Sequence, residues 1–113
     1  MPLVSPLPDP VVVLIAERFR VIGEPMRIRI LDRLRAGESS VQDLVDALET
    51  SQQNVSKHLA VLHRAGIVGR RKDGLHSYYR ITDDSVFAMC ETVCGALQRD
   101  SDTLTAALKA VTR

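Results

Sequence analysis

The chain has 113 residues, of which 45% are hydrophobic and 26% charged, with a formal net charge of +1 at pH 7. This length suits one domain with a single core, and the composition excludes a disordered or fibrous protein. No apolar run is long enough to span a membrane and the N-terminus lacks a secretory pattern, so we expect a cytoplasmic protein without a membrane partner.

The N-terminal third is predicted to form two helices after a proline-rich segment. Residues 1–9 contain three prolines and are predicted to be a flexible arm, which leaves residues 10–113 for the folded domain. Apolar residues three to four positions apart predict a first helix from near Pro10 to Ile22. A second helix is predicted from Pro25 to before Gly37. Its apolar stripe consists of Ile28, Ile30, Leu31 and Leu34.

Two short helices are predicted next. Ser40, three residues before Asp43, resembles a capping box that opens a helix over residues 41–48. Thr50 and Gln53 repeat this pattern and predict the start of another helix. The connection between the two helices is only about three residues long. This arrangement is a helix-turn-helix.

The second of these helices has two distinct faces. It is predicted to run from Thr50 to about Ala65 and to end at Gly66, a residue suited to the left-handed cap position. Its buried face is predicted to consist of Val55, Leu59 and Leu62. Its opposite face is polar, and Gln52 is placed nearer the core. His58 and His63 flank the core face and are interpreted as packing or phosphate-side residues rather than metal ligands.

A β-hairpin is predicted to follow. Residues 67–72 and 75–81 are strand-like, and Asp73-Gly74 between them is a strong hairpin signal. Tyr79 is predicted to face the core and Tyr78 to face solvent or DNA, because side chains alternate across a strand. The predicted fold is therefore mainly α with a small β-hairpin wing, a winged helix-turn-helix.

The chain is predicted to end in one long and one short helix. The long helix covers residues 84–97, and Ser101 or Asp102 is expected to cap the short one, which ends near Val111. The apolar stripe of the long helix consists of Val86, Cys90, Val93 and Leu97. One monomer of this size can hardly bury the stripes of both the first and the last helices. We therefore expect a homodimer formed through the first and last helices.

The charges point to nucleic acid as a partner. Residues 50–80 carry six basic and one acidic side chain, whereas the segments before and after each have a net charge of −2. A basic face that contacts only solvent is the alternative. Polar side chains near a helix start can contact base edges, and basic hairpin residues can contact phosphates of double-stranded DNA. The candidate DNA-binding residues are Ser51, Gln52, Gln53, Asn54, Ser56, Lys57, Arg64, Arg70, Arg71, Lys72 and His76.

Several segments together resemble the ArsR/SmtB family of small bacterial repressors, over roughly residues 15–82. They are PMRIRIL at 25–31, VQDLVDAL at 41–48, SQQNVSKHL at 51–59, LHRAGIV at 62–68, DG at 73–74 and YYRI at 78–81. The resemblance implies a homodimer that binds a palindromic operator and is released by an inducer. It implies no enzyme. In such a dimer the half-sites would lie about 34–36 Å apart.

The candidate effector site lies on the predicted long C-terminal helix. Family members that sense metals often carry cysteines in the first helix of the helix-turn-helix, or Asp, His and Glu ligands on the last helix. Here the first pattern is missing, and the second would have only Asp84 and Glu91. Cys90 and Cys94 lie one helical turn apart and suit arsenite, Cu(I) or cadmium, or thiol oxidation. Packing in an apolar stripe is the competing interpretation of both cysteines.

The sequence leaves three alternatives to such an effector-released repressor. One is an ArsR-like regulator without a metal site. Another is a winged-helix module that binds protein, which would not need a basic recognition surface. The third, an enzyme, has no support, since the chain lacks a glycine-rich phosphate loop and a convincing nucleophile and base pair.

Overall fold

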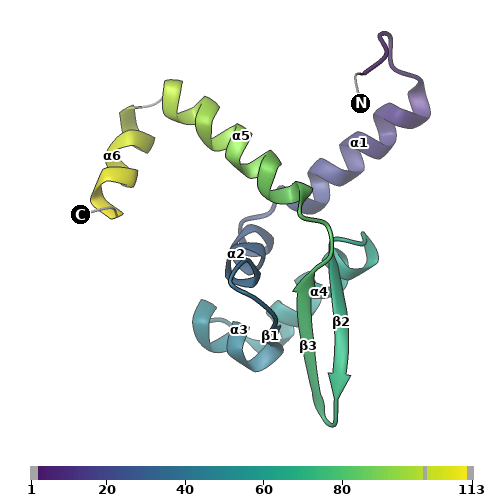
Figure 1. Cartoon of the computed structure of the whole chain (residues 1–113), viewed down its shortest axis with the longest axis vertical. Helices are drawn as coiled ribbons and strands as arrows, with labels where there is room; N and C mark the ends of the chain where they lie inside the picture. The colour runs from purple at the N-terminus through teal and green to yellow at the C-terminus, as the bar shows by residue number, and fades with distance from the viewer. Residues whose placement is uncertain (1–2, 101, 112–113) are drawn as a thin grey trace. The chain divides into compact units, whose positions relative to one another are not determined.

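The structure, a computed structural model, describes residues 3–100 and 102–111 and divides into two compact units, residues 1–83 and 84–113 (Figure 1). The first unit contains α1 (Asp9–Ile22), α2 (Pro25–Leu34), β1 (Ser39–Ser40), α3 (Val41–Leu48), α4 (Gln52–Arg64), β2 (Val68–Asp73) and β3 (His76–Ile81). The second contains α5 (Ser85–Asp100) and α6 (Asp102–Val111). The predicted mainly helical fold with a hairpin wing is confirmed. In the described ranges, no helix is long and apolar enough to cross a membrane.

The core of the first unit lies between α2, α3, α4 and the base of the hairpin. Its buried side chains are Ile22, Ile30, Leu31, Leu34, Leu44, Val55, Leu59, Leu62, Ile67, Val68 and Tyr79. Of the apolar stripe predicted for α2, Ile30, Leu31 and Leu34 are buried, whereas Ile28 is 44% exposed. At about 100° per residue, Ile28 lies roughly 60° beyond Leu31, at the edge of the buried arc of α2.

The caps of α3 and α4 explain where these two helices begin. Ser40 Oγ accepts a hydrogen bond from the backbone N–H of Asp43 at 3.0 Å, which confirms the predicted cap. At α4, Ser51 is the cap and the predicted Thr50 is not, since Ser51 Oγ accepts from the backbone N–H of Asn54 at 3.1 Å. The extended backbone of Ser51 places its hydroxyl under the first turn. The Thr50 hydroxyl instead accepts from the side-chain amide of Asn54.

Two residues with left-handed backbone angles set where α3 and α4 end. α3 ends at Leu48, and Glu49 with φ 51° turns the chain, so the predicted connection over residues 49–51 is confirmed. After α4, Gly66 has φ 77° and the backbone N–H of Ile67 donates to the Leu62 carbonyl at 3.0 Å. Glycine is suited to this helix end because it has no Cβ to oppose a positive φ.

The wing is part of a three-stranded antiparallel sheet with the order β1-β3-β2. The predicted strand limits are wrong by one residue, because Asp73 pairs with His76 and the two-residue loop is Gly74-Leu75. Gly74, with φ 64°, occupies the first loop position, where a tight hairpin turn of this kind needs glycine. β1 was not predicted, since two serines carry no strand pattern. It is defined only by its pairing with β3.

The second unit consists of α5 and α6, which contact each other. The predicted limits of the long helix are close to those of α5, although α5 continues to Asp100. α6 begins at Asp102, and the alternative cap, Ser101, lies outside the described residues. Along the predicted stripe of α5, Val86 is buried, whereas Val93 and Leu97 are 57% and 51% exposed.

Candidate nucleic-acid interface

Helix α4 has one apolar, buried face and one polar, exposed face, as the sequence predicts. Val55, Leu59 and Leu62 are each 0% exposed. Gln52, which was placed nearer the core, is exposed, because it lies in the first turn beyond the packed part of the helix. Asn54 is half-buried and bonded to Thr50. The exposed candidates on this helix and its cap are Ser51, Gln52, Gln53, Ser56, Lys57 and Arg64.

The two histidines of α4 have different surroundings. His58 is buried, with 6% exposure, whereas His63 is exposed. His58 contacts Arg27 and Glu24 near the start of α2. It therefore packs inside the protein, on a different part of the helix from the exposed polar candidates. Sequence reasoning missed this contact because the partners are more than thirty positions away in the chain.

The register of the hairpin assigns its basic residues to two faces. Arg70 and Lys72 are two positions apart on β2 and therefore share one face of the sheet. Arg71 lies on the opposite face, with His76, because Asp73 pairs directly with His76. Both pairs are exposed. The four predicted phosphate contacts thus do not form one continuous patch.

Arg71 is held in place by Glu38, a residue that sequence analysis did not single out. Arg71 Nη2 lies 2.7 Å and Nε 3.2 Å from the two carboxylate oxygens of Glu38, and its guanidinium stacks 4.7 Å from the Tyr78 ring. The hydrogen bond from Arg71 holds the pKa of Glu38 below its usual range. Arg71 is consequently a preorientated cation whose charge is partly balanced. Of the hairpin cations, Arg70 and Lys72 are the better candidates for unbalanced positive charge.

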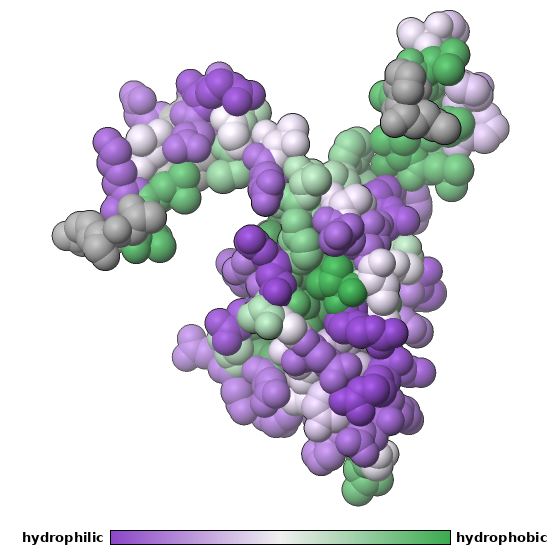
Figure 2. All heavy atoms as spheres, in the orientation of Figure 1, coloured by the Kyte–Doolittle hydropathy of each residue, from purple (hydrophilic) through white to green (hydrophobic). Residues whose placement is uncertain are grey.

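The hairpin is polar along its length and apolar at its tip. Figure 2 shows hydrophilic atoms over most of its visible face and a hydrophobic patch at its end. Leu75, in the turn, is fully exposed. Tyr79 is buried and Tyr78 half-buried on the other face, which confirms the predicted alternation. Tyr79 of β3 and Val68 of β2 thus pack the base of the wing into the core, while the rest of the wing projects from it.

Comparison with known proteins decides the family. The model of the bacterial regulatory proteins of the arsR family matches residues 24–69, which include α2, α3 and α4. The chain belongs to the arsR family. KmtR of Mycobacterium tuberculosis is 37% identical over 82 residues, 73% of this chain and 63% of that protein. The transcriptional repressor SmtB of the same species is 40% identical over 80 residues, 69% of this chain and 59% of that protein.

Another relative is covered more fully. An uncharacterised transcriptional regulator of Methanocaldococcus jannaschii is 42% identical over 72 residues, 63% of this chain and 81% of that protein. The matched region thus covers less than two thirds of KmtR and SmtB but most of this third relative. All three are named as transcriptional regulators, and the matched region of this chain is that of a DNA-binding transcriptional regulator of the arsR family.

Solved structures agree with this assignment. Rv0081 of Mycobacterium tuberculosis has a TM-score of 0.73 and 33% identity, covering 82% of this chain and 97% of that one. Reduced HlyU of Vibrio cholerae has a TM-score of 0.66 and 31% identity, covering 83% and 95%. The DNA-binding domain of Mb0332 from Mycobacterium bovis, described as homodimeric, has a TM-score of 0.67 and 26% identity, covering 88% and 97%.

Proposed function

We propose that this arsR protein is a homodimeric repressor that binds a palindromic operator through α4 and the wing and releases it when Cys90 and Cys94 react. The observation that carries operator binding is the exposed polar face of α4, opposite a fully buried apolar face. A helix anchored in this way can enter the major groove while its polar side chains contact base edges. The wing, with Arg70 and Lys72, supplies phosphate contacts beside it.

The exposed apolar side chains of α1 and α5 support the dimer. On α1, Val13, Leu14 and Phe19 are more than half exposed, as are Val93 and Leu97 on α5. Large apolar side chains gathered on helices in this way are typical of an interface. The homodimeric Mb0332 relative supports the same assembly. Two-fold symmetry then requires two half-sites about one helical turn apart, roughly 34–36 Å.

Substitution of Lys57 and Arg64 by alanine tests operator binding. Neither charge has an ion-pair partner among the described residues, so both are available to DNA. With fragments of genomic DNA selected for binding to the parent, we expect the double variant to bind at least about tenfold more weakly. We also expect the slope of log affinity against log salt to fall by about one unit per lost phosphate contact.

A matched variant removes the same charge elsewhere. Arg29→Ala with Arg33→Ala deletes two exposed arginines of α2, outside the recognition helix and the wing. We expect this control to bind DNA much more strongly than the α4 variant does. If the α4 variant bound the selected DNA as strongly as the parent, α4 would not be the DNA-contacting helix. If no genomic fragment were selected by the parent, a winged-helix module that binds protein would replace the DNA-binding proposal.

The thiols of α5 are the candidate effector site. Cys94 is exposed, Cys90 is half-buried, and neither forms a disulfide. Their spacing of four residues places both on one side of the helix. Among the described residues no group of three or more His, Cys, Asp or Glu side chains could hold a metal ion. One chain therefore provides two thiolate donors, and arsenite, Cu(I) or cadmium would need further ligands, such as those of a second copy.

Substitution of both cysteines by serine tests the effector. We expect arsenite, Cu(I), cadmium or peroxide to release the parent from its selected DNA fragment, and the Cys90→Ser/Cys94→Ser variant to stay bound. Release should follow the thiol chemistry because serine is isosteric but neither binds soft ions nor oxidises. The matched control is Ser85→Ala, at the start of the same helix. A normal response of the double variant would contradict a thiol sensor and favour a regulator without a metal site.

Two relatives are named for opposite directions of regulation. The SmtB relative is named a repressor, whereas HlyU of Vibrio cholerae is named an activator and has a structure described as reduced. A response to peroxide alone would favour thiol oxidation, and a response to arsenite, Cu(I) or cadmium would favour ion binding. Repression itself is tested by placing the selected DNA upstream of a reporter gene, whose expression should rise when the protein is deleted.

A further inference from the structure

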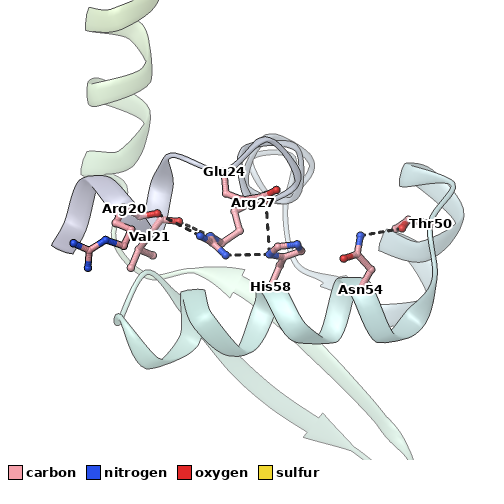
Figure 3. A network of polar contacts seen from close by, with 7 residues as sticks. All are labelled: Arg20, Val21, Glu24, Arg27, Thr50, Asn54 and His58. Atoms are coloured by element: carbon pink, nitrogen blue, oxygen red, sulfur yellow. Dashed lines mark hydrogen bonds and ion pairs between the residues drawn. The ribbon is translucent and has the colours of Figure 1, made fainter. Parts of the chain in front are cut away.

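Arg27 closes the C-terminal end of α1. Its Nε donates to the Val21 carbonyl, and its Nη2 donates to the Arg20 carbonyl at 3.3 Å (Figure 3). The last carbonyls of an α-helix have no partner within the helix. A guanidinium at this end also interacts favourably with the helix dipole. Arg27, although it belongs to α2, therefore fixes the position of the last turn of α1.

The same guanidinium reaches the recognition helix. Arg27 Nη1 lies 3.1 Å from Nδ1 of His58, which is on α4 (Figure 3). Arginine only donates hydrogen bonds, so Nδ1 must accept and carries no proton in this arrangement. Arg27 thus joins the end of α1 to the middle of α4 through a neutral imidazole.

Glu24 provides a second partner for the same nitrogen. Its Oε2 lies 3.7 Å from Nδ1 of His58 and accepts from the backbone N–H of Arg27 at 2.9 Å, which caps α2. The bond from the Arg27 backbone lowers the pKa of Glu24, so this group is a carboxylate at neutral pH. A proton on Nδ1 would face the Arg27 cation at 3.1 Å and would find its acceptor in Glu24 instead.

The surroundings of His58 decide which state is present at neutral pH. Burial lowers the pKa of His58; the charge of Glu24 raises it, and those of Arg27 and Lys57 lower it, with a net lowering. These groups come from the start of α2 and from α4 itself. An ordinary histidine has a pKa of about 6.5, so His58 is neutral at pH 7 and gains its proton only in more acidic solution.

We propose that Arg27 and neutral His58 are positioning residues for the recognition helix, holding α4 against the end of α1 in its DNA-binding orientation until a proton on His58 breaks the contact. This inference rests on the proposed operator binding. Protonation moves the imidazole away from Arg27 and towards Glu24. The protonated Nδ1 then competes with the backbone N–H of Arg27 for the Glu24 carboxylate that caps α2. The position of α4 relative to α1 then loses one of its fixed points, and operator affinity falls in acid.

The test compares pH profiles of operator binding. The dissociation constant for a selected genomic fragment is measured from about pH 8 to about pH 5.5, the range in which histidines titrate. We expect the affinity of the parent to fall towards the acidic end, and the loss to approach tenfold for one pKa unit of coupling as His58 becomes fully protonated. His58→Asn retains an oxygen near the place of Nδ1 but takes up no proton, so its acid loss should disappear.

His63→Asn is the matched control, since it removes an exposed histidine from the same helix. Protonation of exposed histidines near phosphate strengthens binding in acid, which is the opposite sign. The control should therefore keep the acid loss or deepen it. An equal acid loss in the parent and in His58→Asn would overturn the inference while leaving operator binding intact. Absence of DNA binding at every pH would overturn the proposed function and this inference together.

A second measurement needs no variant and remains decisive if His58→Asn does not fold. If the protein binds DNA more tightly when His58 is neutral, then by thermodynamic reciprocity bound DNA must make protonation of His58 less favourable. NMR titration of the His58 ring should therefore give a lower pKa in the complex with DNA than in the free protein. An unchanged or raised pKa of His58 in the complex would overturn the inference.

Discussion

Replacement of Leu97 by glutamate is expected to dissociate the proposed dimer and to lower operator affinity by about 10²- to 10⁴-fold. Leu97 is 51% exposed on α5, in the row of apolar residues that continues from Val93. A charge buried against an apolar partner surface is costly, so association is lost. Each monomer then binds one half-site alone, without the effective concentration that the second half of a dimer provides.

Analytical ultracentrifugation and binding to full operators and half-operators measure both consequences. Leu75→Glu is the matched control for association, because Leu75 is an exposed leucine that lies on the wing rather than on α1 or α5. It should remain dimeric. A Leu97→Glu protein that is still dimeric at micromolar concentration would show that α5 does not form the interface.

Local signals in the sequence were sufficient for most of the fold. The spacing of apolar residues predicted the helices, and Ser40 with Asp43 predicted the start of α3, since a cap involves only residues three positions apart. The predicted cap of α4, Thr50, is one residue before the observed cap, Ser51, because both residues carry a hydroxyl group that can cap a helix. Only the backbone angles of Ser51 distinguish them.

The errors at the site come from contacts between distant parts of the chain. The sequence alone does not distinguish Arg71 from Arg70 and Lys72. The strand register places Arg71 on the opposite face from Arg70, and its guanidinium is hydrogen-bonded to the Glu38 carboxylate. That pair joins residues 33 positions apart, and Arg27 and His58 are 31 positions apart. No periodicity encodes such a pair. It depends on how α2, β1 and the hairpin pack, which local propensity does not determine.

The one-residue error in the hairpin turn shows why register matters for function. With a period of two residues, a shift of one position moves each side chain to the other face. Asp73-Gly74 is the commoner turn signal, yet the pairing of Asp73 with His76 moves the loop to Gly74-Leu75. The apolar side chain of Leu75 therefore lies at the tip of a basic wing. A turn formed by Asp73-Gly74, as predicted, would have been polar.

Replacement of Leu59 by alanine is expected to lower the free energy of unfolding by about 2–5 kcal/mol. Leu59 is 0% exposed and lies between Val55 and Leu62 on the buried face of α4. Its truncation removes apolar burial and leaves a cavity beneath the recognition helix. A small domain has only about 5–15 kcal/mol of stability in total, so much of it would be lost.

Chemical denaturation at one fixed protein concentration measures this loss, because the stability of a dimer depends on concentration. Leu75→Ala is the matched control and should change stability by no more than about 0.5 kcal/mol, since its side chain is exposed. At a temperature where Leu59→Ala is still folded, its operator affinity should also be lower, because α4 is then held less rigidly. A loss of stability no greater than that of the control would contradict the packing of α4 on α2 and α3.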